Sequence, residues 1–176
     1  MKVKKITELN RISVDEFKET DKTPLVIVLD NIRSLNNIGS MFRTSDAFLV
    51  EAIYLCGITA TPPNAEIHKT ALGAENSVEW SYFEDTKDAV RQLKNSGFTV
   101  CAIEQVRNSI MLNNLEPDRG ERYAIVLGNE VKGVSQDVVD ICDMCIEIPQ
   151  FGTKHSLNVS VAAGIVIWNF FCKLIS

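Results

Sequence analysis

The feature that most constrains the fold is a series of short apolar runs separated by polar stretches with helical spacing. Continuous apolar runs of four to eight residues are typical of strands buried on both faces of a parallel sheet. The sequence therefore predicts strands at residues 25–29, 52–56, 98–103, 123–127 and 144–148.

Helical patterns separate most of these runs. Residues 37–50 carry apolar side chains at helical spacing, and Asn37 is expected to cap that helix. Residues 85–95 show the same spacing and stop before Gly97. Alternating strands and helices predict an α/β fold, a mostly parallel sheet with helices on both faces.

The segment from Leu157 to Ile175 is apolar on nearly every side and predicts a long, buried helix. Ser160, Asn169 and Lys173 interrupt it. Its uninterrupted apolar stretches are shorter than the ~20 residues that a membrane span needs, so we do not expect it to enter a bilayer. A helix of this kind packs into the core or against a second subunit.

The length and composition predict a single main domain. Residues 1–22 are mixed in charge and are expected to form an N-terminal arm or short helix before a domain at 23–176. The basic start of the chain has no apolar run behind it, so no secretory signal is expected and we predict a cytoplasmic protein.

The five cysteines predict neither a disulfide framework nor a metal site. Their number is odd, and most lie in apolar stretches where a thiol packs as a small hydrophobic group. Cys142 and Cys145 have the spacing of metal ligands, but no second pair accompanies them and His68 and His155 are distant in sequence. We therefore expect no bound metal.

The net charge of −5 argues against a protein that coats nucleic acid without specificity, because such binding depends on neutralising phosphates. Any contact with RNA would need a local basic surface. The candidates for that surface are Lys2, Lys4, Lys5, Arg11, Arg33, Arg43, Lys69 and Lys154, although scattered, solvated side chains explain those outside the motifs equally well.

The polar segments that follow the predicted strands carry the chemistry of the chain. Residues 30–43 run from a strand end into a helix, with Gly39 allowing close approach and Arg43 offering a planar fork suited to phosphate. A capped helix with an exposed arginine also explains this segment. Residues 126–135 follow another strand, and a tight turn accounts for their glycines but not for Glu130.

A further segment, residues 148–160, leads through a polar loop into the last predicted helix. Ser156 and Asn158 crowd its start, although capping one helix needs only one of them. His155 has no identifiable carboxylate partner and is interpreted as an ordinary loop histidine rather than an acid or base.

In this order and spacing, the three segments resemble the motifs of the SpoU/TrmH family of the SPOUT superfamily. The strings that carry the resemblance are N-N-I-G-S-M-F-R-T-S-D-A-F, L-G-N-E-V-K-G-V-S and I-P-Q-F-G-T-K-H-S-L-N-V-S-V-A-A-G, and it covers about residues 24–172. Residues 67–74 also look like the family's segment between its first two motifs.

The resemblance implies a methyltransferase that uses S-adenosylmethionine to methylate a ribose 2′-hydroxyl of RNA. It also implies a deep trefoil knot in the C-terminal part, which holds the cofactor, and a homodimer whose two subunits build the active site. Knots are rare in proteins, and the pattern of strands and helices does not itself predict one.

The resemblance also assigns site residues. The cofactor pocket is expected at Leu127, Gly128, Ile148, Ser156 and Leu157, and the catalytic group at Asn37, Arg43, Glu130, Ser156 and Asn158. The family casts its arginine as the base that activates the hydroxyl. A guanidinium stays protonated in nearly all proteins, so we interpret Arg43 as binding phosphate and stabilising charge on the 2′-oxygen.

Two other functions are weaker interpretations of the sequence. A nicotinamide- or nucleotide-binding oxidoreductase lacks support because the loop at Gly128 has no G-x-G-x-x-G pattern. An RNA-binding or assembly protein that keeps the fold without catalysis is the alternative, although all the motif side chains are present. Bound S-adenosylmethionine without methyl transfer would favour it.

The expected substrate is a structured RNA, with tRNA preferred to ribosomal RNA. Only about two dozen residues precede the first predicted strand, so a compact dimer would recognise RNA mainly by shape, phosphate and 2′-hydroxyl contacts. The acidic net charge leaves room for an accessory partner protein. The sequence does not indicate the nucleotide.

Overall fold

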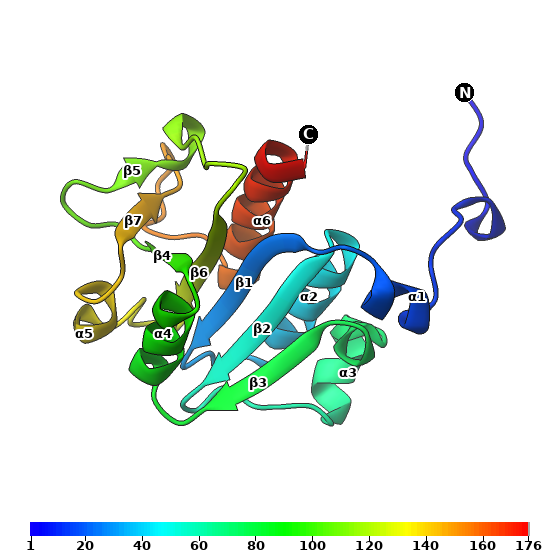
Figure 1. Cartoon of the computed structure of the whole chain (residues 1–176), viewed down its shortest axis with the longest axis horizontal. Helices are drawn as coiled ribbons and strands as arrows, with labels where there is room; N and C mark the ends of the chain where they lie inside the picture. Colours follow the sequence, from blue (N-terminus) through cyan, green and yellow to red (C-terminus); the bar gives the residue numbers. More distant parts are fainter. Residues whose placement is uncertain (176) are drawn as a thin grey trace.

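The computed structural model describes residues 1–175, so Ser176, the last residue of the predicted domain, lies outside the described residues. Its centre is a seven-stranded sheet in the order β3-β2-β1-β6-β4-β7-β5 (Figure 1). All strand pairs within it are parallel. The strands are β1 (Thr23–Asp30), β2 (Val50–Cys56), β3 (Glu79–Phe83), β4 (Phe98–Ile103), β5 (Ile110–Met111), β6 (Arg122–Gly128) and β7 (Met144–Glu147).

The predicted mostly parallel α/β sheet is therefore confirmed, and each predicted strand is present within a residue or two of its expected bounds. Two strands were not predicted. β3 is an edge strand that pairs only with β2, and its polar positions break the apolar run. β5 is two residues long and exposed, too short to give a pattern.

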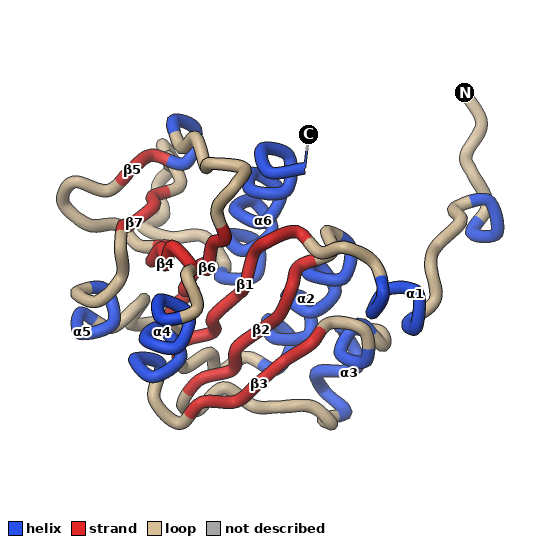
Figure 2. Tube along the Cα trace, in the orientation of Figure 1, coloured by secondary structure: helices blue, strands red, loops and turns tan. Residues whose placement is uncertain are grey.

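Helices cover both faces of the sheet because β1 presents apolar side chains to both (Figure 2). Leu25, Ile27 and Leu29 belong to the larger core, under the helices α2 (Leu35–Ala47), α3 (Ala65–Ala71) and α6 (Val159–Ile175). Val26 and Val28 face the smaller core, under α4 (Thr86–Asn95) and α5 (Gln136–Val139). This alternation follows from the two-residue period of a strand.

Helix α2 begins earlier than predicted, and Asn37 is not its cap. Ser34 occupies the N-cap and its hydroxyl accepts a hydrogen bond from the Asn37 backbone N–H at 3.3 Å. The Asn37 side chain is thereby left available for contacts outside the helix. The helix ends at Ala47, and residue 50 already belongs to β2.

Within its own chain, helix α6 is buried on one face only, so the predicted burial is confirmed for that face alone. It begins at Val159, and the Asn158 side chain caps it by accepting from the backbone N–H groups of Ser160 and Val161. One face contributes Phe170 and other apolar side chains to the core, whereas Trp168 on another face is 53% exposed. The helix is thus two-sided, with an apolar surface facing outward.

The N-terminal segment lies outside the sheet. Figure 1 shows it reaching away from the sheet on the side of α2 and α3. It contains the short helices η1 (Ile6–Glu8) and α1 (Val14–Glu19), and Phe17 is its buried anchor. The remaining short helices are η2 (Ala74–Asn76) and η3 (Leu112–Asn114). Within residues 1–175, no helix has the length and apolar character needed to cross a membrane.

Candidate functional site

The polar loops of the first two motifs meet at the carboxyl edge of the sheet. β1 and β6 are neighbours that end in register, with Asp30 opposite Gly128. The loops that follow are tied together because the Asn129 side chain donates to the Asn31 carbonyl at 2.7 Å. Carboxyl ends of parallel strands are the usual position of ligand sites in open α/β sheets.

Glu130 connects the second loop to the start of α2. Its carboxylate accepts hydrogen bonds from the backbone N–H groups of Arg33 and Ser34, each at 3.0 Å, and from the side-chain amide of Asn37 at 3.1 Å. A carboxylate at this place also interacts favourably with the positive end of the helix dipole. A tight turn explains the neighbouring glycines, whereas Glu130 is explained by its hydrogen bonds to the start of α2 and to Asn37.

These contacts favour the charged form of Glu130. Partial burial of the carboxyl raises its pKa, but the donors at Arg33, Ser34 and Asn37 outweigh that effect and hold the pKa below its usual value. The group therefore remains an anion over the neutral range.

Asn37 extends this network to the third motif. The Asn158 amide donates to the Asn37 side-chain oxygen at 3.2 Å, while the Asn158 oxygen caps α6. Asn37 thus uses its donor on Glu130 and its acceptor on Asn158, which fixes the orientation of its amide. Side chains from all three motifs form one continuous chain of hydrogen bonds.

A cavity of about 390 Å³ lies beside this chain of hydrogen bonds. The predicted cofactor residues Leu127, Gly128, Ile148, Ser156 and Leu157 all line it, as do Glu130 and Asn158 from the predicted catalytic group. Asn37 and Arg43 are not among its lining residues. The structure therefore gathers the second and third motifs around one cavity and places Arg43 elsewhere.

The cavity wall requires glycine at position 128. A Cβ on Gly128 would lie 2.1 Å from the backbone of Gly133 and Val134, where no side chain fits. Glu104 supports the same turn by accepting from the Val134 N–H at 3.0 Å, and it also lines the cavity. Glu104 was not predicted from the sequence, although a carboxylate directly after the buried strand β4 could have indicated a site residue.

Gly39 serves helix packing. A Cβ there would lie 2.3 Å from the Ile67 carbonyl oxygen and 2.1 Å from the Thr70 hydroxyl, so only glycine lets α2 and α3 approach this closely. The group that approaches Gly39 closely, as expected, is therefore the backbone of α3 at Ile67. The Thr70 hydroxyl donates across the contact to the Asn36 carbonyl at 3.1 Å.

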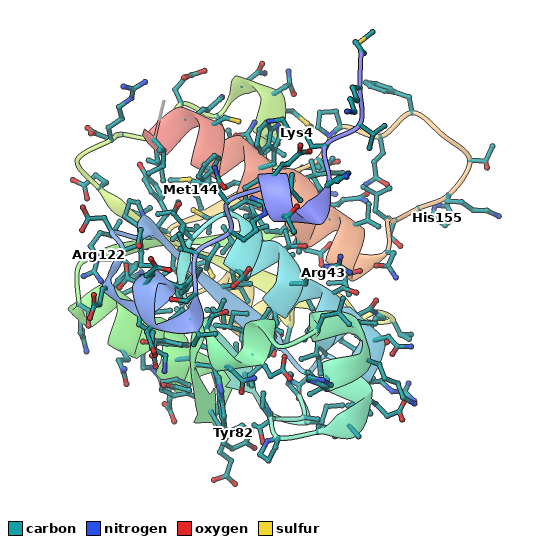
Figure 3. The ribbon with its side chains drawn as sticks, turned by 90° about the vertical axis from the view of Figure 1, so that its right-hand side faces the viewer. Lys4, Arg43, Tyr82, Arg122, Met144 and His155 are labelled. Carbon is teal, nitrogen blue, oxygen red and sulfur yellow. The ribbon has the colours of Figure 1, made fainter. Side chains whose placement is uncertain are left out.

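Arg43 and His155 lie on separate elements. Figure 3 shows Arg43 on α2 and His155 on the loop that precedes α6, away from Arg43. Arg43 is exposed, and within residues 1–175 its guanidinium makes no hydrogen bond or ion pair. The His155 carbonyl accepts from the Gln105 side chain at 2.7 Å, so its backbone helps to shape the cavity.

Cys56, Cys101, Cys142 and Cys145 are free thiols. Burial raises the pKa of Cys142 to about 12, and burial likewise raises the pKa of Cys145, so both remain protonated near neutrality. Within residues 1–175, no three histidine, cysteine or acidic side chains are grouped closely enough to hold a metal ion.

The model of the SpoU rRNA Methylase family matches residues 24–168. A 23S rRNA (guanosine-2′-O-)-methyltransferase, RlmB, from Neisseria meningitidis serogroup B is 33% identical over 153 residues, which are 87% of this chain and 60% of that protein. A tRNA (guanosine(18)-2′-O)-methyltransferase from Aquifex aeolicus is 34% identical over 156 residues, 87% of this chain and 71% of that protein.

Solved structures share the fold. An AdoMet-bound rRNA methyltransferase from Sinorhizobium meliloti has a TM-score of 0.80 at 24% identity, covering 91% of this chain and 61% of that one. A TrmH/SpoU tRNA-modifying enzyme from A. aeolicus has a TM-score of 0.79 at 26% identity, covering 91% and 81%. The match over residues 24–168 and the identity to these relatives show that this chain belongs to the SpoU rRNA methylase family.

Proposed function

We propose that this chain transfers a methyl group from S-adenosylmethionine to a ribose 2′-hydroxyl of RNA. The observation that carries the proposal is the side-chain network of Glu130, Asn37 and Asn158 beside the cavity at the carboxyl edge of the sheet. The named activities of the two relatives, each a guanosine 2′-O-methyltransferase, support the same reaction.

The cavity fits S-adenosylmethionine in size and chemistry. Its volume of about 390 Å³ lies within the range of small-molecule sites. Leu127, Ile148 and Leu157 offer an apolar surface to an adenine ring. Glu104 and Glu147 add carboxylates to the lining, which suits a ligand that carries a sulfonium and an ammonium group.

The chain's own residues hold the cavity and orient the reacting groups. When bound, S-adenosylmethionine supplies a methyl group whose carbon the ribose 2′-oxygen attacks, in line with the positively charged sulfur that departs. Glu130 and Asn37 keep the start of α2 fixed against the cavity wall. Arg43 projects from the same helix with a free, permanently charged guanidinium.

We assign Arg43 to the RNA. Its planar fork binds a phosphate next to the reacting ribose and stabilises negative charge as it develops on the 2′-oxygen. The hydroxyl proton then passes to phosphate or solvent, since the guanidinium is already fully protonated. The reaction gains mainly from orientation of the two reacting centres.

The working unit that we propose is a homodimer. Arg43 does not line the cavity of its own chain, so a second copy can supply it. The exposed side of α6 offers an apolar surface for that contact, with Val161, Ile165 and Trp168 at 52%, 39% and 53% exposure. Trp168 and Phe171 also stack on each other and contact Phe48 at the end of α2.

We propose that the C-terminal part is knotted, as in the family. The segment 104–121, between β4 and β6, is held against the chain that follows β7 at two places. Gln105 donates to the His155 carbonyl, and Lys173 in α6 donates to the Leu115 carbonyl. These contacts support a C-terminal segment that passes through the loop formed by residues 104–121.

Among RNA classes we propose tRNA. Support comes from the A. aeolicus relative named for tRNA, of which this chain spans the larger share, 71% against 60% for the relative named for 23S rRNA. Mapping 2′-O-methylation across total RNA with and without the gene tests this preference. Loss at one tRNA ribose supports it, whereas loss confined to ribosomal RNA overturns it.

Calorimetry and a methyl-transfer assay test the function itself. We expect saturable binding of S-adenosylmethionine and of its demethylated product, no binding of NAD, and transfer of the methyl group to RNA. Binding of NAD without a response to S-adenosylmethionine would contradict the proposal. Binding of S-adenosylmethionine without any transfer would instead support the non-catalytic alternative. The cytoplasmic location and an accessory protein stay predictions.

A further inference from the structure

A second cavity, of about 610 Å³, lies between the N-terminal half of α3 and the edge strand β3. It shares no residue with the cavity at the carboxyl edge of the sheet. Its lining residues are Pro62, Pro63, Asn64, Ala65, His68, Glu75, Asn76 and Trp80. Nothing in the proposed methyl transfer uses these side chains, so the cavity calls for a separate explanation.

A histidine with a fixed hydrogen-bonding role lines this second cavity. His68 Nδ1 lies 2.5 Å from a carboxylate oxygen of Glu75, whose side chain is only 9% exposed. The other Glu75 oxygen accepts from the Gly73 N–H at 3.0 Å, which anchors the carboxylate. A carboxylate only accepts, so Nδ1 carries a hydrogen, and in the neutral form of the ring Nε2 is then an acceptor. Within residues 1–175, Nε2 has no partner.

Two asparagines add donors. The Asn64 oxygen caps α3 by accepting from the N–H groups of Glu66 and Ile67, so its NH₂ group stays available. The Asn76 side chain is exposed and forms no hydrogen bond within the described residues. The second cavity thus offers both donors and an acceptor whose bonding capacity is not used internally.

The apolar and charged groups narrow the class of ligand. Trp80, which is half-buried, and Pro62, which is buried, both line the cavity, so part of its wall is apolar. Within the described residues, no lysine or arginine lines the cavity, and the one carboxylate there is already bonded. The lining therefore suits an uncharged ring with polar edges better than a phosphate. Proteins that bind single-stranded RNA stack unpaired bases on aromatic side chains in this way.

We propose that the second cavity binds an unstacked nucleobase of the substrate RNA. The proposal rests on the proposed function only in taking the ligand to be RNA. Trp80 supplies the stacking surface, and His68, Asn64 and Asn76 recognise the polar edge of the base.

The position of α3 relates this cavity to Arg43. Helix α3 turns Ile67 and Thr70 toward Gly39 of α2, and Ala65 and His68 toward the cavity. Arg43 lies one turn beyond Gly39 on α2. A nucleotide near the phosphate bound at Arg43 can therefore place its base in the cavity, on the other side of a single short helix.

Tryptophan fluorescence tests base binding directly. The chain has two tryptophans, so Trp168→Phe leaves Trp80 as the only one. In this background we expect saturable quenching by single-stranded hexaadenylate and hexauridylate RNA, and none by ribose 5-phosphate. Adding His68→Phe and Asn76→Ala should weaken binding about tenfold or more, as expected for two lost hydrogen bonds. Glu66→Gln, on α3 but outside the lining, should leave it unchanged.

Steady-state methyl transfer separates this proposal from the proposed function. We expect the His68/Asn76 variant to raise KM for RNA about tenfold while kcat and S-adenosylmethionine affinity stay constant. Asn76→Ala alone, at an exposed side chain, provides the same test if the double variant does not fold. No quenching by either RNA, or equal quenching by ribose 5-phosphate, overturns the base site even if methyl transfer is intact. Quenching without methyl transfer retains the base site and overturns only the proposed function.

Discussion

Asn37 and Glu130 lie 93 residues apart in the chain, yet their side chains are joined by a hydrogen bond of 3.1 Å. The same carboxylate accepts from the backbone at Arg33 and Ser34, so it fixes both the start of α2 and the orientation of Asn37. Asn37 in turn holds the Asn158 amide. One anion therefore organises the segments that surround the cavity.

Glu130→Gln should lower both stability and activity. The substitution replaces one acceptor oxygen by an NH₂ group that faces a backbone N–H, so we expect a loss of about 1 kcal/mol in the free energy of unfolding. Methyl transfer should fall at least about tenfold because the start of α2 loses its anchor. Urea titration and a transfer assay measure these effects. Glu84→Gln, an exposed carboxylate without a hydrogen bond in the described residues, serves as the control and should change neither.

The contribution of Glu130 should depend on pH. Its pKa in the folded protein is below the usual value of 4.5, so the unfolded chain takes up the proton first as the pH falls. The stability that its charged form contributes is complete above about pH 5 and is lost as the pH falls through the lower, folded pKa. Unfolding curves of wild type and Glu130→Gln should therefore differ by a constant amount from pH 5 to 8 and converge below 4.5. A difference that grows on acidification would contradict this assignment.

Gly128→Ala should distort the cavity wall. The added Cβ meets the backbone of Gly133 and Val134 at 2.1 Å, so the turn must move, at a cost of about 1–3 kcal/mol. We expect S-adenosylmethionine affinity to fall together with stability. Gly120→Ala meets only the Asp118 side chain at an ordinary 3.4 Å and should be nearly neutral in both calorimetry and thermal unfolding.

Arg43→Ala should separate cofactor binding from catalysis. The Arg43 guanidinium makes no hydrogen bond within residues 1–175 and the residue does not line the cavity, so stability should change by less than about 0.5 kcal/mol and S-adenosylmethionine should bind as in wild type. Transfer should fall more than about a hundredfold. Arg43→Lys should not restore it, because an ammonium cannot bind phosphate as a planar fork. Normal transfer by Arg43→Ala would refute its assigned role.

Trp168→Asp should convert the proposed dimer to a monomer. The substitution places a charge on the exposed apolar face of α6, where Trp168 is 53% exposed and a partner would have to desolvate it. Light scattering at micromolar concentration measures the change in mass. Ile58→Asp is the control, since Ile58 is 64% exposed and belongs to the loop after β2 instead of to α6. A wild-type protein that is active as a monomer would contradict the dimer.

The sequence by itself predicted the elements whose pattern is local and strong. Buried strands such as β1 and β6 appear as continuous apolar runs because both of their faces are covered. The edge strand β3 and the seven-residue helix α3 gave no such pattern, because one is half polar and the other is too short. The order of the strands, with β6 between β1 and β4, depends on pairing over long distances and is invisible in any local window.

The features of the site likewise divide into those that the sequence indicated and those that only the tertiary structure decided. The sequence indicated Asn37, Glu130 and Asn158 as polar side chains beside strand ends or helix starts, but a capping function for Asn37 was wrong because Ser34 takes that position. Only the tertiary structure decided that these three side chains bond to one another, that Glu104 joins the cavity, and that Arg43 lies outside it. The physical reason is that the sheet brings the ends of β1, β4 and β6 to one edge, and hydrogen bonds between side chains form only after that assembly.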